Sequence, residues 1–94
     1  MNSPTLPKID LSTFFLSVSS AAFWGMGITP PGSQEKPQID LEMARHNIDL
    51  LELIEEKTRG NRTPDESKLA EQLLFETRMR FVELERQLKA GSKA

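Results

Sequence analysis

A helix stop followed at once by a helix start constrains this fold more than any other feature of the sequence. Gly60 follows a segment with helical periodicity, and glycine readily adopts the left-handed conformation that ends a helix. Thr63-Pro64-Asp65-Glu66 then has the pattern of a capping box, in which the side chains of Thr63 and Glu66 each accept a hydrogen bond from the other's backbone N–H. Pro64 stands at the first helical position, where its missing N–H costs no hydrogen bond. Two helices joined this closely are expected to pack antiparallel.

Other punctuation in the sequence predicts the rest of an all-α chain. Asp10 or Ser12 can cap an apolar helix over 9–28, and Asp40 can cap the first arm of the hairpin. The prolines of residues 29–39 predict a semi-extended linker between the two. We therefore expect a flexible arm at 1–8, the N-terminal helix at 9–28, the linker, a helical hairpin at 40–90 (helices 41–59 and 64–89), and a tail at 91–94. Gly91 is expected to end the last helix before this tail.

The apolar residues of 41–59 are spread too widely for a single neighbour. On a helical wheel they cover about 180°, against roughly 100° for a helix buried on one side. The residues of this arc are Leu41, Met43, Ala44, Ile48, Leu50, Leu51 and Ile54. We expect two packing partners for this helix: the second arm of the hairpin, and either the N-terminal helix or another chain.

The second arm carries two apolar faces. Its main stripe consists of Leu69, Leu73, Leu74, Thr77, Phe81, Leu84 and Leu88. On the opposite side Phe75, Met79 and Val82 follow helical spacing and predict a second interface. At 1.5 Å per residue the arms measure about 28 Å and about 39 Å, so Leu84 and Leu88 project past the first arm and need a cover.

The N-terminal helix is suited to close packing. Small residues recur at every fourth position, namely Thr13, Ser17, Ala21 and Gly25. Phe14, Phe15, Phe23 and Trp24 surround them, and each is expected to gain on the order of 2 kcal/mol from burial. Three destinations stay open for this helix: the core beside the hairpin, a seam between identical chains, or a membrane surface or foreign partner.

A polar pair is predicted inside the hairpin. Asn47 lies within the apolar arc of the first arm, and counting outward from the turn places it near Thr77. A buried hydrogen bond between the two side chains is expected to fix the register of the arms.

Residues that carry chemistry are scarce. The chain has one histidine, His46, and no cysteine, so no nucleophile–base pair of the usual kind can be assembled. His46 stands one turn from Glu42 and Asp49, which is more typical of a solvated helix surface than of a metal site. The sequence therefore predicts no catalytic residues, no metal and no cofactor.

Nucleic-acid binding and membrane insertion are also disfavoured. The net charge is −2, and the arginines at 78, 80 and 86 alternate with glutamates, which favours salt bridges within the bundle. Before residue 35 only Lys8 and Asp10 are charged, but serines interrupt the apolar run, which is shorter than the 20 or so residues of a membrane span. The same dilution, and Asp10, argue against a signal peptide.

Three groups of residues resemble an uncharacterised bacterial family, domain of unknown function 1844, over almost the whole chain. They are Ile9-Asp-Leu-Ser-Thr-Phe14 with the serine-rich segment after it; Asp40-Leu-Glu-Met-Ala44 with Ile48-Asp-Leu-Leu-Glu52; and Glu55-Glu-Lys-Thr-Arg-Gly-Asn61 with Arg78-Met-Arg-Phe-Val-Glu83. Arg62 and Thr77 stand where the family pattern favours larger apolar residues. The resemblance implies a small, cytoplasmic, helical bacterial protein and no particular activity.

We therefore expect a non-enzymatic protein that acts by self-association or by binding a protein partner. A peripheral membrane or secretion-linked assembly factor that uses the N-terminal helix is the alternative. The residues expected at the interface are Phe14, Ser17, Ala21, Phe23, Trp24, Gly25, Phe75, Met79, Val82, Leu84 and Leu88.

Overall fold

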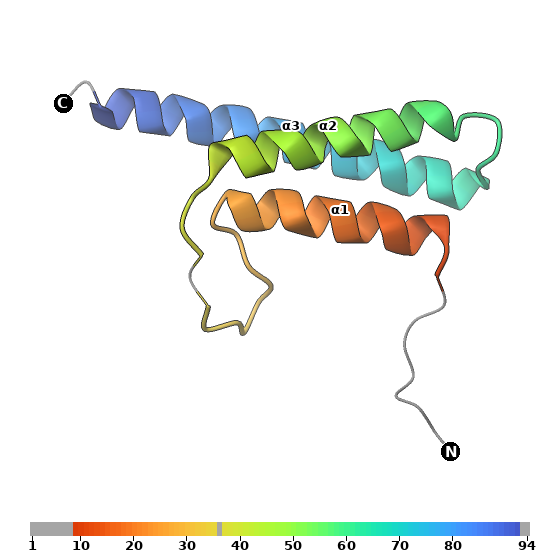
Figure 1. Cartoon of the computed structure of the whole chain (residues 1–94), viewed down its shortest axis with the longest axis horizontal. Coiled ribbons are helices and arrows are strands. Elements are labelled where there is room, and N and C mark those ends of the chain that lie inside the picture. Colours follow the sequence, from red (N-terminus) through yellow and green to blue (C-terminus); the bar gives the residue numbers. More distant parts are fainter. Residues whose placement is uncertain (1–8, 36, 93–94) are drawn as a thin grey trace, which may run out of the picture.

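The computed structural model describes residues 9–35 and 37–92, which form α1 (Leu11–Gly25), α2 (Leu41–Lys57) and α3 (Pro64–Ser92) (Figure 1). The all-α prediction and the order of its elements are confirmed. The expected arm at 1–8 and the last two residues of the tail lie outside the described residues. Gly91 does not end the last helix as predicted, because α3 continues through it to Ser92.

The predicted caps are present at the start of each helix. The carboxylate of Asp10 accepts a hydrogen bond from the N–H of Thr13 at 2.8 Å, and that of Asp40 accepts one from Met43 at 3.1 Å. At α3 the capping box is complete, since the Thr63 N–H donates to Glu66 at 2.8 Å and the Glu66 N–H donates to Thr63 at 3.1 Å. These local bonds satisfy backbone donors that have no partner inside a helix.

Both of the first two helices end slightly earlier than predicted. Gly27 adopts a positive φ of 80°, and the N–H groups of Gly27 and Ile28 donate back to Trp24 and Phe23, which closes α1 at Gly25. At the end of α2 the Thr58 hydroxyl donates to the Ile54 carbonyl at 2.7 Å, and Gly60 turns the chain with a φ of 85°.

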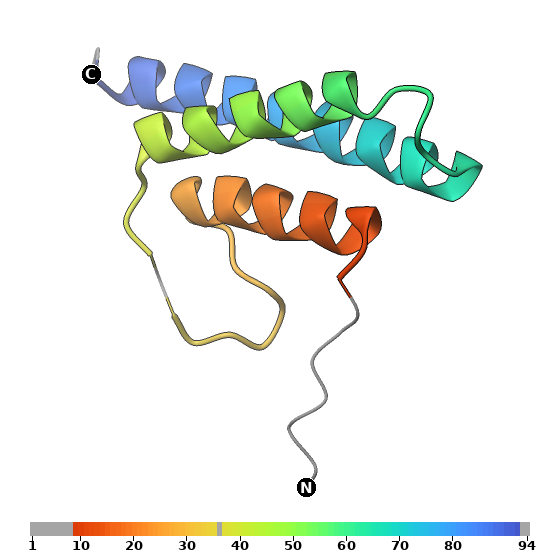
Figure 2. The same cartoon turned by 45° about the vertical axis from the view of Figure 1, so that its right-hand side comes forward.

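The three helices form a small bundle in which α1 covers the hairpin. α2 and α3 run antiparallel, and α1 lies alongside them with its direction opposite to that of α2 (Figures 1 and 2). α1 contacts both arms, so its packing partner is the hairpin of its own chain. This contact supplies the second neighbour that the wide apolar arc of α2 predicts.

The core consists of two clusters that each draw on all three helices. The cluster nearer the α2–α3 turn contains Phe15, Val18, Leu51, Ala70, Leu73 and Leu74. The cluster nearer the linker contains Ala22, Met26, Ala44, Ile48 and Phe81, with Phe23, Leu41 and Leu84 packed against it. α1 therefore belongs to the core along its whole length.

The end of α1 is clasped to the start of α2 by a close backbone approach at Gly25. The N–H of Asp40 donates to the Gly25 carbonyl at 2.8 Å. A Cβ atom at Gly25 would lie 2.8 Å from the backbone nitrogen of Ala44, which is closer than real Cβ contacts come. Only glycine fits here without moving one helix.

The predicted groove of small residues is only partly used. Gly25 is buried, but Thr13 and Ala21 are half-buried and Ser17 is exposed. The buried face lies one position further round the helix and contains Phe15, Val18 and Ala22. This face packs inward because burying large side chains such as Phe15 and Val18 gains more free energy than burying small ones.

The predicted hydrogen bond between Asn47 and Thr77 does not form. The Asn47 side-chain amide donates to the carbonyl of Met43 at 2.9 Å, and the Thr77 hydroxyl donates to that of Leu73 at 2.7 Å. Each polar group is satisfied one turn back in its own helix, where the carbonyl is the nearest acceptor. Thr77 is fully buried nonetheless, and the register is held by the core clusters instead.

Candidate functional site

The outward side of α3 carries a stripe of large apolar side chains that nothing in the described chain covers. Phe75 is 67% exposed, Met79 52% and Val82 61%. Their spacing of four and three residues places them on one side of the helix. Single exposed apolar residues are common, but an aligned group that includes an aromatic marks an interaction surface more specifically.

This stripe forms the floor of a groove of about 780 Å³ between α3 and the C-terminal part of α2. The residues that line it are Glu55, Arg59, Glu71, Leu74, Phe75, Arg78, Met79, Val82, Glu83 and Arg86. The floor is apolar and the rim bears charges of both signs. That composition suits an amphipathic helix, whose apolar face would lie on the floor while its charges meet the rim.

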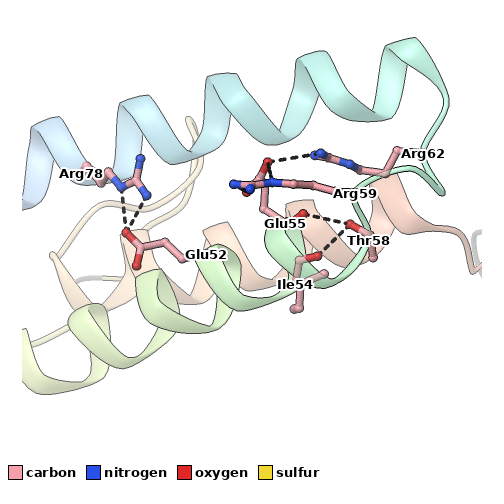
Figure 3. A network of polar contacts seen from close by, with 7 residues as sticks. All are labelled: Glu52, Ile54, Glu55, Thr58, Arg59, Arg62 and Arg78. Carbon is pink, nitrogen blue, oxygen red and sulfur yellow. Dashed lines mark hydrogen bonds and ion pairs between the residues drawn. The ribbon is translucent and has the colours of Figure 1, made fainter.

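Ion pairs hold one end of the groove in place. Glu55 of α2 accepts from Arg59 at 3.0 Å and from Arg62, in the turn, at 3.2 Å (Figure 3). The hydrogen bond from Arg59 lowers the pKa of the Glu55 carboxyl below its ordinary value, and the two positive charges act in the same direction while burial opposes them. The same bond raises the pKa of Arg59.

Arg62 is the least expected member of this group. Its side chain is only 9% exposed, and its Nε and one terminal nitrogen have no hydrogen-bond acceptor within the described residues. Its ion pair with Glu55 therefore supplies the acceptor for a largely buried guanidinium. The sequence contains little indication of this pair. Gly60 lies between Glu55 and Arg62, so the spacing rules for residues within one helix do not apply to them.

A second ion pair joins α3 to α2. Arg78 of α3 donates to Glu52 of α2 through two nitrogens, at 2.6 Å and 2.8 Å (Figure 3). Arg80 pairs with Glu76 at 3.8 Å, and Arg86 pairs with Glu83. The basic group on α3 thus takes part in ion pairs within the bundle, as the interleaved glutamates predict.

The remaining residues expected at the interface do not join this groove. Leu84 and Phe23 pack against the second core cluster, and Gly25 is buried against α2. Trp24 lies with Phe23 beside a separate hollow of about 470 Å³, bounded by Ile28 and other linker residues. Phe14, Ser17 and Leu88 are exposed and Ala21 is half-buried, all outside the groove lining.

A comparison with known protein families identifies the family of this chain. A family model described as domain of unknown function DUF1844 matches residues 8–83. The chain belongs to the DUF1844 family. No curated protein and no solved structure gives a significant match.

The DUF1844 match bears directly on the groove. It spans α1, the linker, α2 and α3 as far as Glu83, so the stripe of Phe75, Met79 and Val82 lies inside the family domain. Leu84, Arg86 and Leu88 lie beyond it. The apolar floor is thus a feature of the matched domain, while part of the charged rim follows it.

The described part of the DUF1844 chain holds one histidine and three helices. His46 is exposed on α2, and residues 9–35 and 37–92 contain no cluster of three side chains suited to hold a metal ion. No helix within those residues has the length and apolar character needed to cross a membrane.

Proposed function

We propose that this DUF1844 protein is non-enzymatic and acts by binding an α-helix of another polypeptide in the groove along α3. The observation that carries the proposal is the aligned exposure of Phe75, Met79 and Val82 beside that groove. Covering apolar surface gains roughly 25 cal/mol per Å², and a helix can cover all three side chains at once. The mixed charges of the rim would then select the direction and register of the bound helix.

The other parts of the proposal rest on composition and family. A chain with one histidine and no cysteine has few routes to nucleophilic catalysis by a histidine-activated serine or cysteine, which favours a binding role. The cytoplasmic location and bacterial origin implied by the family resemblance belong to the same proposal.

A photo-reactive amino acid placed at position 79 tests the groove directly. The full-length protein is irradiated in extract of its own cells, and adducts are identified by mass spectrometry. We expect defined adducts from position 79 to a helical segment of a protein chain. Position 80 is the matched control, because Arg80 is exposed on another side of the same helix.

The outcome has two clear readings. Adducts specific to position 79 support the proposal, whether the captured chain is this protein or another. Equal labelling from positions 79 and 80, or labelling of lipid instead of protein, contradicts it.

A further inference from the structure

The outer face of α3 is complementary to itself when it is read in reverse. Along the face Glu71 comes first, then Phe75, Met79 and Val82, and finally Arg86. An acid stands at one end, a base at the other and the apolar stripe between them. Resting on the function proposed above, we propose that the helix bound in the groove is α3 of a second copy of this chain, packed antiparallel.

A single two-fold axis satisfies both the apolar and the charged positions. The midpoint between Phe75 and Val82 falls between Arg78 and Met79, and so does the midpoint between Glu71 and Arg86. In an antiparallel pair centred there, Phe75 lies opposite Val82 of the second copy and Glu71 lies opposite Arg86 of the second copy. Each contact occurs twice, as a two-fold interface requires.

Neighbouring registers are less favourable. A shift of three residues in one direction pairs Phe75 with Met79 of the second copy but places Glu71 opposite Glu83, and two like charges repel. A shift of four residues in the other direction keeps Met79 opposite Val82 of the second copy but places Phe75 opposite Arg86, so both phenylalanines lose their apolar partner. The central register is the one that pairs Phe75 with Val82 and Glu71 with Arg86. It places Met79 opposite Arg78 of the second copy beside the axis.

The two charged residues are accessible for this pairing. Glu71 is exposed and makes no ion pair within the described residues, and Arg86 is exposed with its partner Glu83 on the same helix. At the outer ends the register brings Lys68 opposite Lys89 of the second copy, which opposes association. The interface consists of one helix face from each chain, which is a small contact compared with specific complexes that bury roughly 1,200 Å² or more. We therefore expect a dimer that dissociates on dilution.

Charge exchange tests both the dimer and its register. Full-length Glu71→Arg and Arg86→Glu are each expected to weaken dimerisation about tenfold, because each change turns two attractive pairs into repulsive ones. An equimolar mixture of the two variants should form heterodimers, since every facing pair is then of opposite sign. The double variant should recover the original affinity, and Lys68→Glu should strengthen the dimer. Sedimentation equilibrium over a range of concentrations measures all of these.

The altered residues are exposed, and far-UV circular dichroism checks that each variant keeps its helices. A protein that stays monomeric at every concentration overturns the dimer, while adducts to a different protein from position 79 would leave the groove's binding role in place. A dimer whose affinity ignores both charge changes overturns the register. Recovery in the mixture and in the double variant supports it, because a structural defect in either single variant would not be repaired by combining them.

Discussion

α1 and the outer face of α3 are both rich in apolar residues, but the fold treats them differently. α1 places Phe15, Val18 and Ala22 against the hairpin, where they form part of both core clusters. The outer face of α3 leaves Phe75, Met79 and Val82 in solvent. The difference follows from geometry, since a hairpin has two sides and one short helix can cover only one of them.

This comparison separates stability from association. Changes on the inner face of α1 should lower the free energy of unfolding of the single chain. Changes on the outer face of α3 should leave that free energy almost unaltered and act on binding instead.

The largest effect is expected for Phe15→Ala. Phe15 is fully buried, and removing a buried phenylalanine side chain typically costs about 3–5 kcal/mol in free energy of unfolding. Urea denaturation followed by circular dichroism measures this loss. Phe14→Ala is the matched control, because its side chain is 46% exposed and should cost much less. Similar losses for the two variants would show that α1 does not dock through the Phe15 face.

Gly25→Ala should come next. The new Cβ would lie 2.8 Å from the backbone nitrogen of Ala44, and overpacking of this kind costs about 1–3 kcal/mol. Gly91→Ala, in open space within α3, is expected to be neutral or to stabilise by up to about 1 kcal/mol. Thermal unfolding of both variants distinguishes them. If alanine at position 25 leaves stability unchanged, the close backbone approach between α1 and α2 does not require glycine.

A smaller effect is expected in the ion pairs beside the groove. Glu55→Gln removes the charge that faces the buried Arg62 guanidinium, at a cost of about 1.5 kcal/mol. Arg62→Leu should be close to neutral, because it removes the buried charge and leaves Glu55 paired with Arg59. Unfolding by urea at neutral pH compares the two. If Arg62→Leu proves the more damaging, the ion pair stabilises the turn more than burial penalises it.

The same network predicts a dependence on pH. Arg59 and Arg62 hold the pKa of Glu55 below its ordinary value of 4.5 in the folded protein. The stabilisation from this carboxylate is therefore complete above pH 4.5 and is lost as the pH falls through the lowered pKa. The difference in unfolding free energy between the wild type and Glu55→Gln should shrink as the pH is lowered through this range. A difference that stays constant would exclude the ionised form of Glu55 as its source.

The smallest effect on stability is expected at the outer face. Met79→Gln should change the unfolding free energy of dilute protein by no more than about 0.5 kcal/mol, because Met79 is 52% exposed and lies outside both core clusters. It should nevertheless weaken self-association clearly, whereas Arg80→Gln should affect neither property. Sedimentation equilibrium supplies the comparison. Unchanged association in Met79→Gln would remove the stripe from the interface.

Local signals in the sequence predicted the elements of the fold well. The capping box at Thr63, the caps at Asp10 and Asp40 and the turn at Gly60 depend on neighbouring residues, which a sequence displays directly. The exposed stripe on α3 was also visible, since helical spacing alone separates its two faces. Gly91 failed as a stop because a glycine in a helix costs only about 1 kcal/mol when the chain can continue.

Contacts between helices were harder to predict. Asn47 and Thr77 were expected to pair because both lie in apolar stripes, but each found a carbonyl in its own helix. The face of α1 that packs inward differs by one position from the stripe of small residues. The buried ion pair of Arg62 depends on how the turn folds, which the spacing of charges does not reveal.

Oxidation of the methionines tests the central claim most directly. Peroxide converts methionine to its sulfoxide most readily where the sulfur is accessible, and mass spectrometry follows each site separately. Met26, at the end of α1, is 5% exposed, and Met79 is 52% exposed. In dilute protein Met79 should oxidise faster than Met26, and raising the protein concentration should slow oxidation at Met79 while leaving Met26 unchanged. Equal rates at the two sites in dilute protein would contradict the claim that α1 covers one side of the hairpin and leaves the outer face of α3 open.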